Sequence, residues 1–492
     1  MPDSRSRHDG ELRQLVLAGR IPVDDWAAFL TADGADSLAL WFGAGNLGTA
    51  TAVRHAIDRD IAAIDAMIAA QLDAILHHPK FQALEASWRG LGWLAGQIEN
   101  GPGDRVVVRV LNATWRAIEL DMTRASDTGQ SQLFLKIYES EFGQAGGEPF
   151  GLLVADHAVR HDRTDDTAVL EHLMEIGARA FAPIIVGAHP RLLAADDFGE
   201  LGAVGNPAAC FDAPEYGRWN RLRDSLDARF LGVALPRVLA RPPWPDDGTR
   251  GDGFRYRERA RSIGDRLWMN AAYPFAAVVA RAVANYGWPA DIRGADSGRV
   301  GGGLVTGPPM ERHTLSPTLA LPRLPLEIVF GDRQERALTE AGLMPLGALP
   351  YGEELLFGVV RALYRPPRLM GPASQAAAAN HLVGTQLNAT LCAARFAHFL
   401  KIRARDAIGR APTADAIQRE LRTWLSGFVN RNPQAGPDLR AKHPLYEADV
   451  EVTERLDKPG YFACKITLQP YLQLDDVNAK FAFETEIAAA AA

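Results

Sequence analysis

Cysteine is scarce in this sequence, and neither sign of charge dominates it. The 492 residues contain only Cys210, Cys392 and Cys464, an odd number of widely separated thiols. A secreted domain held together by disulfides would be rich in paired cysteines, so a reducing compartment fits this sequence better. The 53 lysine and arginine residues are outnumbered by 60 aspartate and glutamate residues, which gives a formal net charge of −7. This balance argues against a general nucleic-acid-binding protein, which would carry a basic excess.

The sequence also lacks a segment suited to a membrane. Its first ten residues are polar and charged, without the apolar stretch of a secretory signal peptide. The most apolar long stretch, residues 267–284, contains Pro274 and Arg281 and is shorter than a membrane span. We therefore expect a buried helix at 267–284, and a soluble, cytoplasmic protein without membrane insertion.

Length and composition predict several folded domains. Hydrophobic residues make up 47% of the chain and charged residues 23%, which is ordinary for globular proteins and excludes wholesale disorder. A chain of this length is enough for about two to four domains. A stretch rich in proline and small residues, 364–379, is the best candidate for a boundary. We expect a helical and flexible segment over 1–50, the main domains over 51–370, and a carboxy-terminal domain over 371–492.

Apolar residues in the first hundred positions recur at helical spacing. Short helices are predicted over 11–21 and 26–30, and longer ones through 57–75 and over 81–97, with His-His-Pro at 77–79 separating the last two. The first of the long helices carries a seam of residues spaced three or four apart, as in a coiled coil: Ile57, Ile61, Ile64, Ile68, Leu72 and Ile75. Such a seam requires a partner helix, in this chain or on another subunit.

Beyond residue 100 the pattern alternates between strands and helices. β-Branched and apolar runs predict strands over 105–111, 150–155 and 183–187, and a helix is predicted over 168–180. This alternation indicates an α/β region with at least a partly parallel sheet.

The carboxy-terminal region is predicted to contain helices followed by strands. Helical patterns cover 376–408 and 415–429, and strand-like patterns cover 450–452, 462–468 and 481–487. The fold class expected for the whole chain is therefore mixed α/β, with long amino-terminal helices, a central mixed sheet flanked by helices, and terminal strands.

The sequence at 43–48 is a literal G-x-G-x-x-G, the motif of dinucleotide-binding proteins. It follows an apolar run at 38–42 and precedes a helix, as that motif should. A nucleotide-binding unit would then need a second strand that ends in an acid for the ribose. Here the helix continues to about residue 76, and the acids at a suitable distance, Asp60 and Asp65, lie on it. A flexible joint is the better interpretation, and a dinucleotide-dependent oxidoreductase remains the alternative from another functional class.

Other patterns that could support catalysis or metal binding are weak. His157 and His161 have the i, i+4 spacing of metal ligands, but no glutamate completes a metalloprotease motif, and solvated side chains explain them better. His398 is interpreted as a packed histidine. The glycines at 301–303 lack the Lys-Ser/Thr of a phosphate-binding loop, and no G-x-S-x-G motif occurs. We therefore predict no catalytic residue, no metal site and no cofactor, and expect a protein that is not an enzyme.

Two stretches resemble a known family. Residues 75–94, ILHHPKFQALEASWRGLGWL, resemble the signature of the large contractile-sheath subunit of type VI secretion systems, the TssC/VipB/EvpB family. Residues 138–155, YESEFGQAGGEPFGLLVA, resemble the next block of that family. Further similar segments follow in the family's order, among them LWMNAAY at 267–273, RFAHFLK at 395–401 and QPYLQL at 469–474. A collinear series of this length is far more specific than any single short motif.

The resemblance implies a structural role in a phage-tail-like injection machine. It implies a helical sheath built from copies of this chain and a small TssB/VipA-like subunit, around an Hcp-like inner tube and on a baseplate. In the family, strands of neighbouring subunits interlock, and contraction drives the tube out without a cofactor. It further implies contacts with other subunits at these residues: Ile57, Ile61, Ile64, Ile68, Leu72, Phe462, Ile466, Phe481 and Phe483.

Two further expectations follow from the same resemblance. An amino-terminal helix of the family binds the ATPase ClpV in some systems, and Leu12, Leu15 and Val16 are the corresponding apolar residues here. A sheath protein of a phage or phage-like tail is the alternative within the same mechanical class. A small TssB-like partner would favour the type VI interpretation, because simple phage sheaths use one type of subunit.

Overall fold

The computed structural model divides into two compact units, each of which is considered by itself: Met1–Leu84 with Pro242–Arg266, and Glu85–Arg241 with Leu267–Ala492. The residues that the structure describes are 11–20, 23–43, 48–99, 106–142, 146–246, 248, 253–296, 298–316, 319–349, 352–367, 381, 384–408, 413–432, 434–454, 461–470 and 481–488.

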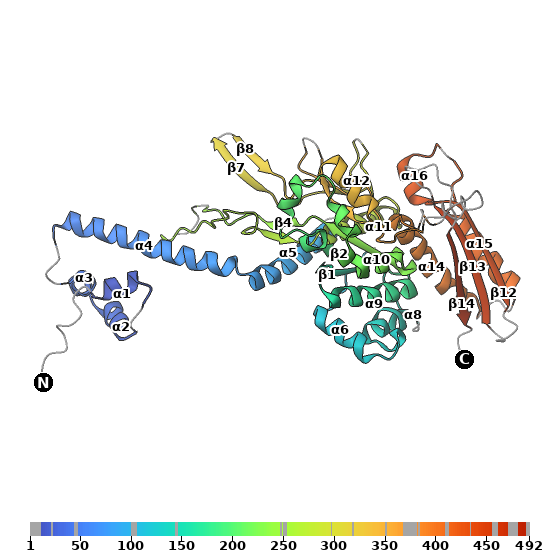
Figure 1. Cartoon of the computed structure of the whole chain (residues 1–492), viewed down its shortest axis with the longest axis horizontal. Helices are drawn as coiled ribbons and strands as arrows, with labels where there is room; N and C mark the ends of the chain where they lie inside the picture. The colour runs from blue at the N-terminus through green and yellow to red at the C-terminus, as the bar shows by residue number, and fades with distance from the viewer. Residues whose placement is uncertain are drawn as a thin grey trace. The chain divides into compact units, whose positions relative to one another are not determined.

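The first unit is built mainly from helices (Figure 1). Three short helices, α1 (Glu11–Leu17), α2 (Val23–Thr31) and α3 (Gly34–Phe42), precede the long helix α4 (Ala50–Leu76). The hydroxyl of Thr49 accepts a hydrogen bond from the Ala52 amide and caps the amino terminus of α4. The next helix, α5 (Pro79–Glu99), begins at Pro79, where a missing amide hydrogen costs nothing. The predicted break at 77–79 is confirmed.

The second unit contains a four-stranded sheet in the order β1-β2-β3-β9, with every neighbouring pair parallel. Its strands are β1 (Leu153–Val159), β2 (Ile184–Ala188), β3 (Leu231–Leu235) and β9 (Met344–Pro345). The predicted α/β alternation is confirmed, because helix α9 (Thr164–Ala180) connects β1 to β2. The strand predicted over 150–155 begins later than expected, at Leu153.

Both faces of this sheet are covered, and β2 and β3 are apolar and buried along their whole length, whereas β1 also carries Asp156 and His157. On one face, Ile184 and Val186 lie in a core with residues of α9 and of α10 (Gly217–Asp224). On the other face, Ile185 lies in a core with α11 (Ala272–Tyr286). A side chain at Gly90 of α5 would lie about 2.5 Å from the Tyr273 ring, so this glycine permits α5 to approach α11 closely.

The antiparallel strands of this mixed fold lie in separate small sheets. They are β4 (Val238–Arg241) with β5 (Leu267–Met269), β7 (Glu311–Ser316) with β8 (Leu319–Arg323), and β6 (Leu304–Val305), β10 (Gly347–Ala348) and β11 (Leu355–Leu356) together. The other α-helices that the structure describes in this region are α6 (Trp115–Arg124), α7 (Gln132–Phe134), α8 (Ser140–Phe142) and α12 (Asp332–Glu340).

The single buried helix expected at 267–284 is wrong at its beginning. Trp268 belongs to β5 and pairs with Leu239 of β4. The side-chain oxygen of Asn270 then accepts a hydrogen bond from the Ala272 amide, 2.9 Å away, and α11 begins at Ala272. An apolar run alone did not distinguish a buried strand from a buried helix.

The strand predicted over 105–111 is also wrong for the chain considered alone. In the part that the structure describes, 106–111 belongs to no strand. Its β-branched sequence favours an extended backbone, but a strand also requires a neighbour with which to exchange hydrogen bonds.

The carboxy-terminal part forms its own core (Figure 1). Helices α14 (Leu387–Ile408) and α15 (Ala414–Ser426) are followed by the short helix α16 (Pro437–Lys442) and an antiparallel sheet in the order β12-β13-β14. Its strands are β12 (Leu445–Glu454), β13 (Tyr461–Pro470) and β14 (Phe481–Ala488), so the predicted terminal strands are confirmed. Ile417, Leu421 and Leu425 recur every four residues along α15 and are buried in this core.

None of the helices in the described segments is long and apolar enough to cross a membrane.

Candidate subunit-interaction surfaces

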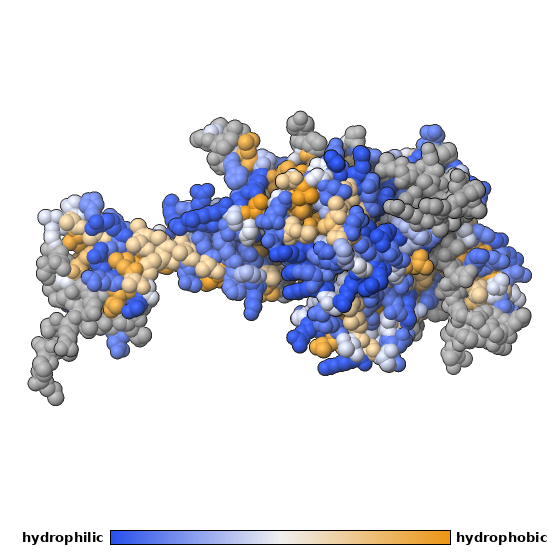
Figure 2. Space-filling model, viewed as in Figure 1, coloured by the Kyte–Doolittle hydropathy of each residue, from blue (hydrophilic) through white to orange (hydrophobic). Residues whose placement is uncertain are grey.

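The seam of α4 is largely uncovered in this chain. Ile61, Ile68 and Ile75, spaced seven residues apart, are 52%, 43% and 45% exposed. Ile57 and Leu72 are half-buried. Figure 2 shows a band of apolar colour along this helix. A row of large aliphatic side chains at this spacing is the pattern that one helix of a coiled-coil pair presents to the other.

The remaining seam residue, Ile64, packs inside the chain. It contacts a small cluster in which Leu12 and Val16 of α1 and Trp41 of α3 are buried. Leu15, the third residue predicted for the ClpV-binding helix, is half-buried. The apolar face of α1 is therefore turned towards its own chain, and any partner of that face would have to replace the contacts with Trp41 and Ile64.

A buried carboxylate fixes this helical cluster to α4. Arg13 of α1 donates two hydrogen bonds to Asp60, with Nε 2.6 Å from Oδ2 and Nη2 2.7 Å from Oδ1. The Trp41 indole Nε1 donates a third, 2.9 Å from Oδ2. The hydrogen bonds from Arg13 lower the pKa of Asp60, against the opposing effect of burial. Three helices thus share one anion, and the paired charge is stable in its apolar surroundings.

We expect Asp60→Ala to release the three short helices from α4. The change removes the acceptor for Arg13 and Trp41 and should lower the local opening free energy by roughly 2 kcal/mol. Hydrogen exchange of the α1 and α3 amides measures this effect. Asp58→Ala, an exposed acid on the same helix, is the control. Unchanged protection of α1 in Asp60→Ala would contradict the assigned role.

We also expect acid to release the same helices. Because the pKa of Asp60 is lowered in the folded chain, its contribution to stability is complete above the unfolded value of about 3.9 and is lost as the pH falls through the lowered value. Exchange protection of α1 should therefore decrease on acidification in the unmodified chain. In Asp60→Ala, protection should start low and respond far less to pH across that range.

The carboxy-terminal residues predicted to contact other subunits have different environments. Phe462 and Ile466 are buried in the core between the sheet and α14 and α15. The side chains of Phe481 and Phe483 lie outside the described residues, but their strand, β14, pairs with β13 over eight residue pairs. Among the described strands, none pairs with the outer edge of β14. The outer edge of β14 is thus a backbone edge that no described strand covers, whereas the side chains of Phe462 and Ile466 are buried inside this chain.

The segment 106–111 is a second stretch of backbone that pairs with no described strand. Val107 is 71% exposed, and Val108, Val110 and Leu111 are exposed as well. Within the described structure, residues 106–110 make no hydrogen bond to another backbone group. The segment is nevertheless held in place, because Arg109 Nη1 lies 2.5 Å from the buried Glu141 carboxylate and its guanidinium stacks on Phe150. Apolar residues on both faces are typical of a strand inside a covered sheet.

An exposed apolar row on α5 was not among the predicted contact residues. Phe81, Leu84 and Trp88 are all exposed, Trp88 by 66%, and their spacing of three and four places them on one face. They lie within the segment 75–94 on which the family resemblance rests. Their spacing in the sequence predicts that they share one helix face. It does not predict whether that face is exposed, because a buried helix face has the same spacing.

The geometry does not support the dinucleotide alternative. The apolar run before Gly43 is helix α3, not the strand from which a dinucleotide-binding loop emerges. The helix after Gly48, α4, is 27 residues long, and Asp60 on it is bound by Arg13 and Trp41. Residues 44–47 of the motif lie outside the described residues.

The histidines considered as metal ligands or bases have structural partners. His157 stacks on Trp115 with ring centroids 3.8 Å apart, and its Nε2 lies 3.1 Å from Asp166 Oδ1. His161 bonds to a backbone carbonyl through Nδ1 and stacks on Tyr216. Among the residues described, no group of three histidine, cysteine or acidic side chains could hold a metal ion.

The other residues with potential chemistry are buried. His398 bonds through Nε2 to the Ala180 carbonyl, 2.9 Å away, and burial lowers its pKa to about 4, which confirms it as a packed histidine. Burial raises the pKa of the Cys392 thiol to about 12 and that of Cys464 to about 11. Neither thiol is therefore a nucleophile at neutral pH.

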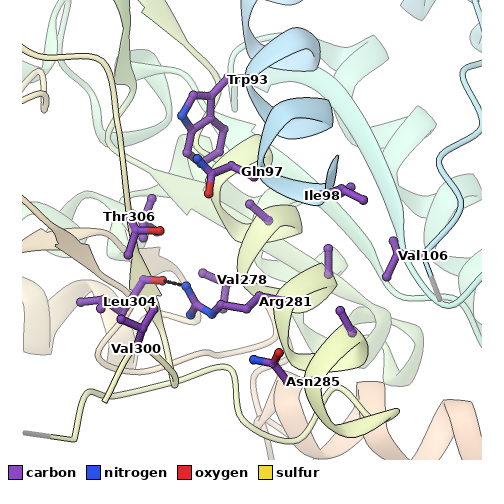
Figure 3. A pocket seen from close by; sticks show the side chains of 14 residues that line it. Trp93, Gln97, Ile98, Val106, Val278, Arg281, Asn285, Val300, Leu304 and Thr306 are labelled. Atoms are coloured by element: carbon purple, nitrogen blue, oxygen red, sulfur yellow. Dashed lines mark hydrogen bonds between the residues drawn. The ribbon is translucent and has the colours of Figure 1, made fainter. Parts of the chain in front are cut away.

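A pocket of about 390 Å³ lies between α5 and α11 (Figure 3). Trp93, Ile98 and Val278 contribute to its mostly apolar wall. Arg281 is the only ionisable side chain among the described lining residues, and it donates hydrogen bonds to the backbone carbonyls of Leu304 and Gly302. With its charge engaged in this way, the wall offers neither an acid–base pair nor a nucleophile.

Most of the chain is similar to known tail-sheath proteins. Residues 58–363 match the family model described as EvpB/VC_A0108, tail sheath N-terminal domain, and residues 376–487 match the EvpB/VC_A0108, tail sheath gpW/gp25-like domain. The chain is 33% identical over 439 residues to the type VI secretion system sheath protein TssC1 of Pseudomonas aeruginosa, covering 88% of this chain and 86% of that protein.

Both models describe tail sheaths, so the chain is a structural sheath protein. It belongs to the VipB/EvpB family and is a sheath subunit of a type VI secretion system, as the resemblance of residues 75–94 and 138–155 predicts.

Proposed function

We propose that this chain polymerises with a small sheath subunit and with copies of itself into a helical, contractile sheath around an inner tube. The observation that carries the proposal is the row of Ile61, Ile68 and Ile75 on α4, which is exposed along one line of a 27-residue helix. A helix of another chain laid along this row would bury all three side chains. Since each of these side chains is already about half buried, covering the rest of it would contribute about 1 kcal/mol.

The unpaired backbone edges support the same proposal. An added strand forms hydrogen bonds with the amides and carbonyls that point towards it, and both 106–111 and the outer edge of β14 offer such groups. Strands shared between subunits would connect neighbours while whole domains move as rigid bodies during contraction.

The remaining expectations belong to the same proposal. The sheath works in the bacterial cytoplasm, contacts an Hcp-like tube and a baseplate, and is not an enzyme. A ClpV-type ATPase would release sheath subunits by binding α1. The apolar face of α1 would first have to separate from Trp41. The carboxy-terminal domain extends over 371–492, where α14, α15 and the terminal sheet share a core that also includes Trp288.

Co-expression with a small, TssB-like sheath subunit tests the proposal. We expect tubes visible by electron microscopy that contain both chains, and irregular aggregates or no particles when this chain is expressed alone. Both chains should co-purify through a tag on either one. A soluble, monomeric chain that does not bind the small subunit would overturn the proposal.

A further inference from the structure

The segment 254–261 of the first unit, FRYRERAR, carries an arginine at every second position. Arg255, Arg257, Arg259 and Arg261 are all exposed. The residues between them, such as Tyr256 and Glu258, are half-buried or buried. Burial that alternates at each residue is the signature of an extended segment with one face inward. The arginines therefore form a row on its outer face, with successive charges about 6.6 Å apart along the backbone.

The inner face fixes this segment to α4 and its carboxy-terminal cap. The Tyr256 hydroxyl donates a hydrogen bond to Asp73 Oδ1, 2.7 Å away. Glu258 lies 3.2 Å from His77 Nε2 and also accepts a hydrogen bond from the Trp244 amide. These contacts hold the backbone in place, so the arginine row is preorganised rather than a collection of independent surface charges.

The charges of this row are not neutralised within the described chain. Arg255 has one distant carboxylate, Asp246 Oδ2 at 3.9 Å, and Arg257, Arg259 and Arg261 form no ion pair with any described residue. Three adjacent uncompensated guanidinium groups repel one another. An anionic surface that covers the three groups would offset this repulsion energy. On a chain with a net charge of −7, such a row is a local exception.

The second unit carries an acidic row with the same period. On β12, Glu447, Asp449 and Glu451 alternate with residues of the opposite face, where Val450 and Val452 are buried. Asp449 and Glu451 are exposed. Asp449 pairs with Arg422 at 2.7 Å, but both side chains are about half exposed, so this pair contributes little to folding.

We propose that the arginine row at 255–261 of one copy docks on the acidic row of β12 of a second copy in the sheath. Both rows repeat every second residue of an extended backbone, so several opposite charges meet at once in a single register. Arg257 and Arg259 lie at the centre of the basic row and face Asp449 and Glu451. The inference rests on the proposed sheath function and adds a specific, charge-selected contact between identical chains.

Two charge-reversed chains test this contact. Variant A carries Arg257→Glu and Arg259→Glu, and variant B carries Asp449→Lys and Glu451→Lys; each is co-expressed with the small subunit. Each variant alone should yield roughly tenfold fewer tubes than the unmodified chain, because like charges meet at every contact. Tubes should return when A and B are co-expressed with different tags, since A then docks on B and B on A. The mixed tubes should contain both tags.

The control is Arg116→Glu with Arg124→Glu, which makes the same change in net charge at exposed positions of α6. It should assemble normally. Raising the salt from about 0.1 M to about 1 M, which shortens the screening length from about 10 Å to about 3 Å, should weaken the unmodified tubes. Unmodified tubes also show that the proposed function holds, independently of the variants.

Two results would overturn the inference. One is normal tubes from variant A or B alone. The other is failure of the A and B mixture although each variant still binds the small subunit. If variant A forms normal tubes but loses binding to heparin, the arginine row serves another polyanion, and the contact between copies is rejected.

Discussion

Deleting residues 478–492 is expected to abolish long tubes while leaving the domains folded. The deletion removes β14, which pairs only with β13 among the described strands, and leaves Phe462 and Ile466 in their core. Each hydrogen bond lost between subunits is worth only about 0.5–1.5 kcal/mol, but every subunit loses the same set. Tube length in electron micrographs, compared with soluble yield, measures the effect.

A single substitution should act in the same direction. Ala482 pairs with Thr467 of β13, and Ala482→Pro removes one donor and distorts the strand. Ala491→Pro, beyond the end of β14, is the matched control and should leave the tubes unchanged. Tubes of normal length from the deletion variant would show that strands are not shared at this end of the chain.

Ile61→Asp combined with Ile68→Asp should produce a folded chain that no longer binds the small subunit. Both side chains are exposed, so the carboxylates remain solvated in the free chain. In a helix pair they would be buried without partners, which costs several kcal/mol and should weaken binding by more than roughly 100-fold. Co-purification through a tag on the small subunit measures the loss.

The α4 helix supplies its own control. Ala63 and Ala70 are exposed and also seven residues apart, about 200° around the helix from Ile61 and Ile68. Ala63→Asp with Ala70→Asp adds the same charge to the opposite face and should preserve binding. Ile64→Asp should instead disrupt the contact with Leu12 and Trp41 inside the chain. Equal loss of binding from both double variants would contradict an interface on the isoleucine row.

Local rules predicted much of the fold. Helical spacing and the proline at 79 were sufficient to locate α4 and α5, because those signals depend only on neighbours in the sequence. The seam was predicted to require a partner helix in this chain or on another subunit; Ile64 packs against its own chain, whereas Ile61 and Ile68 are exposed. The alternation of strands and helices predicted the parallel sheet, since parallel neighbours require crossover helices.

The errors occurred where structure depends on distant residues. Trp268 forms a strand because Leu239 pairs with it, and nothing in 267–284 indicates that neighbour. Strand position alone placed Phe462 and Ile466 among the predicted contacts with other subunits, which stay a prediction; that α14 and α15 cover these side chains depends on residues distant in the sequence. The alternating arginines at 255–261 were visible in the sequence. Their meaning depends on which face Tyr256 and Glu258 turn towards α4.

The exposed segment 106–111 also has a consequence for the life of the protein in the cell. Residues 106–110 make no hydrogen bond to another described backbone group, and an exposed, β-branched backbone of this kind is a surface that chaperones bind and that drives aggregation. A copy made in excess of its partner is an orphan subunit and enters quality control. We expect its half-life in a pulse-chase experiment to lengthen with the supply of the small subunit. Balanced synthesis of the two chains is then a requirement set by one short stretch of valines.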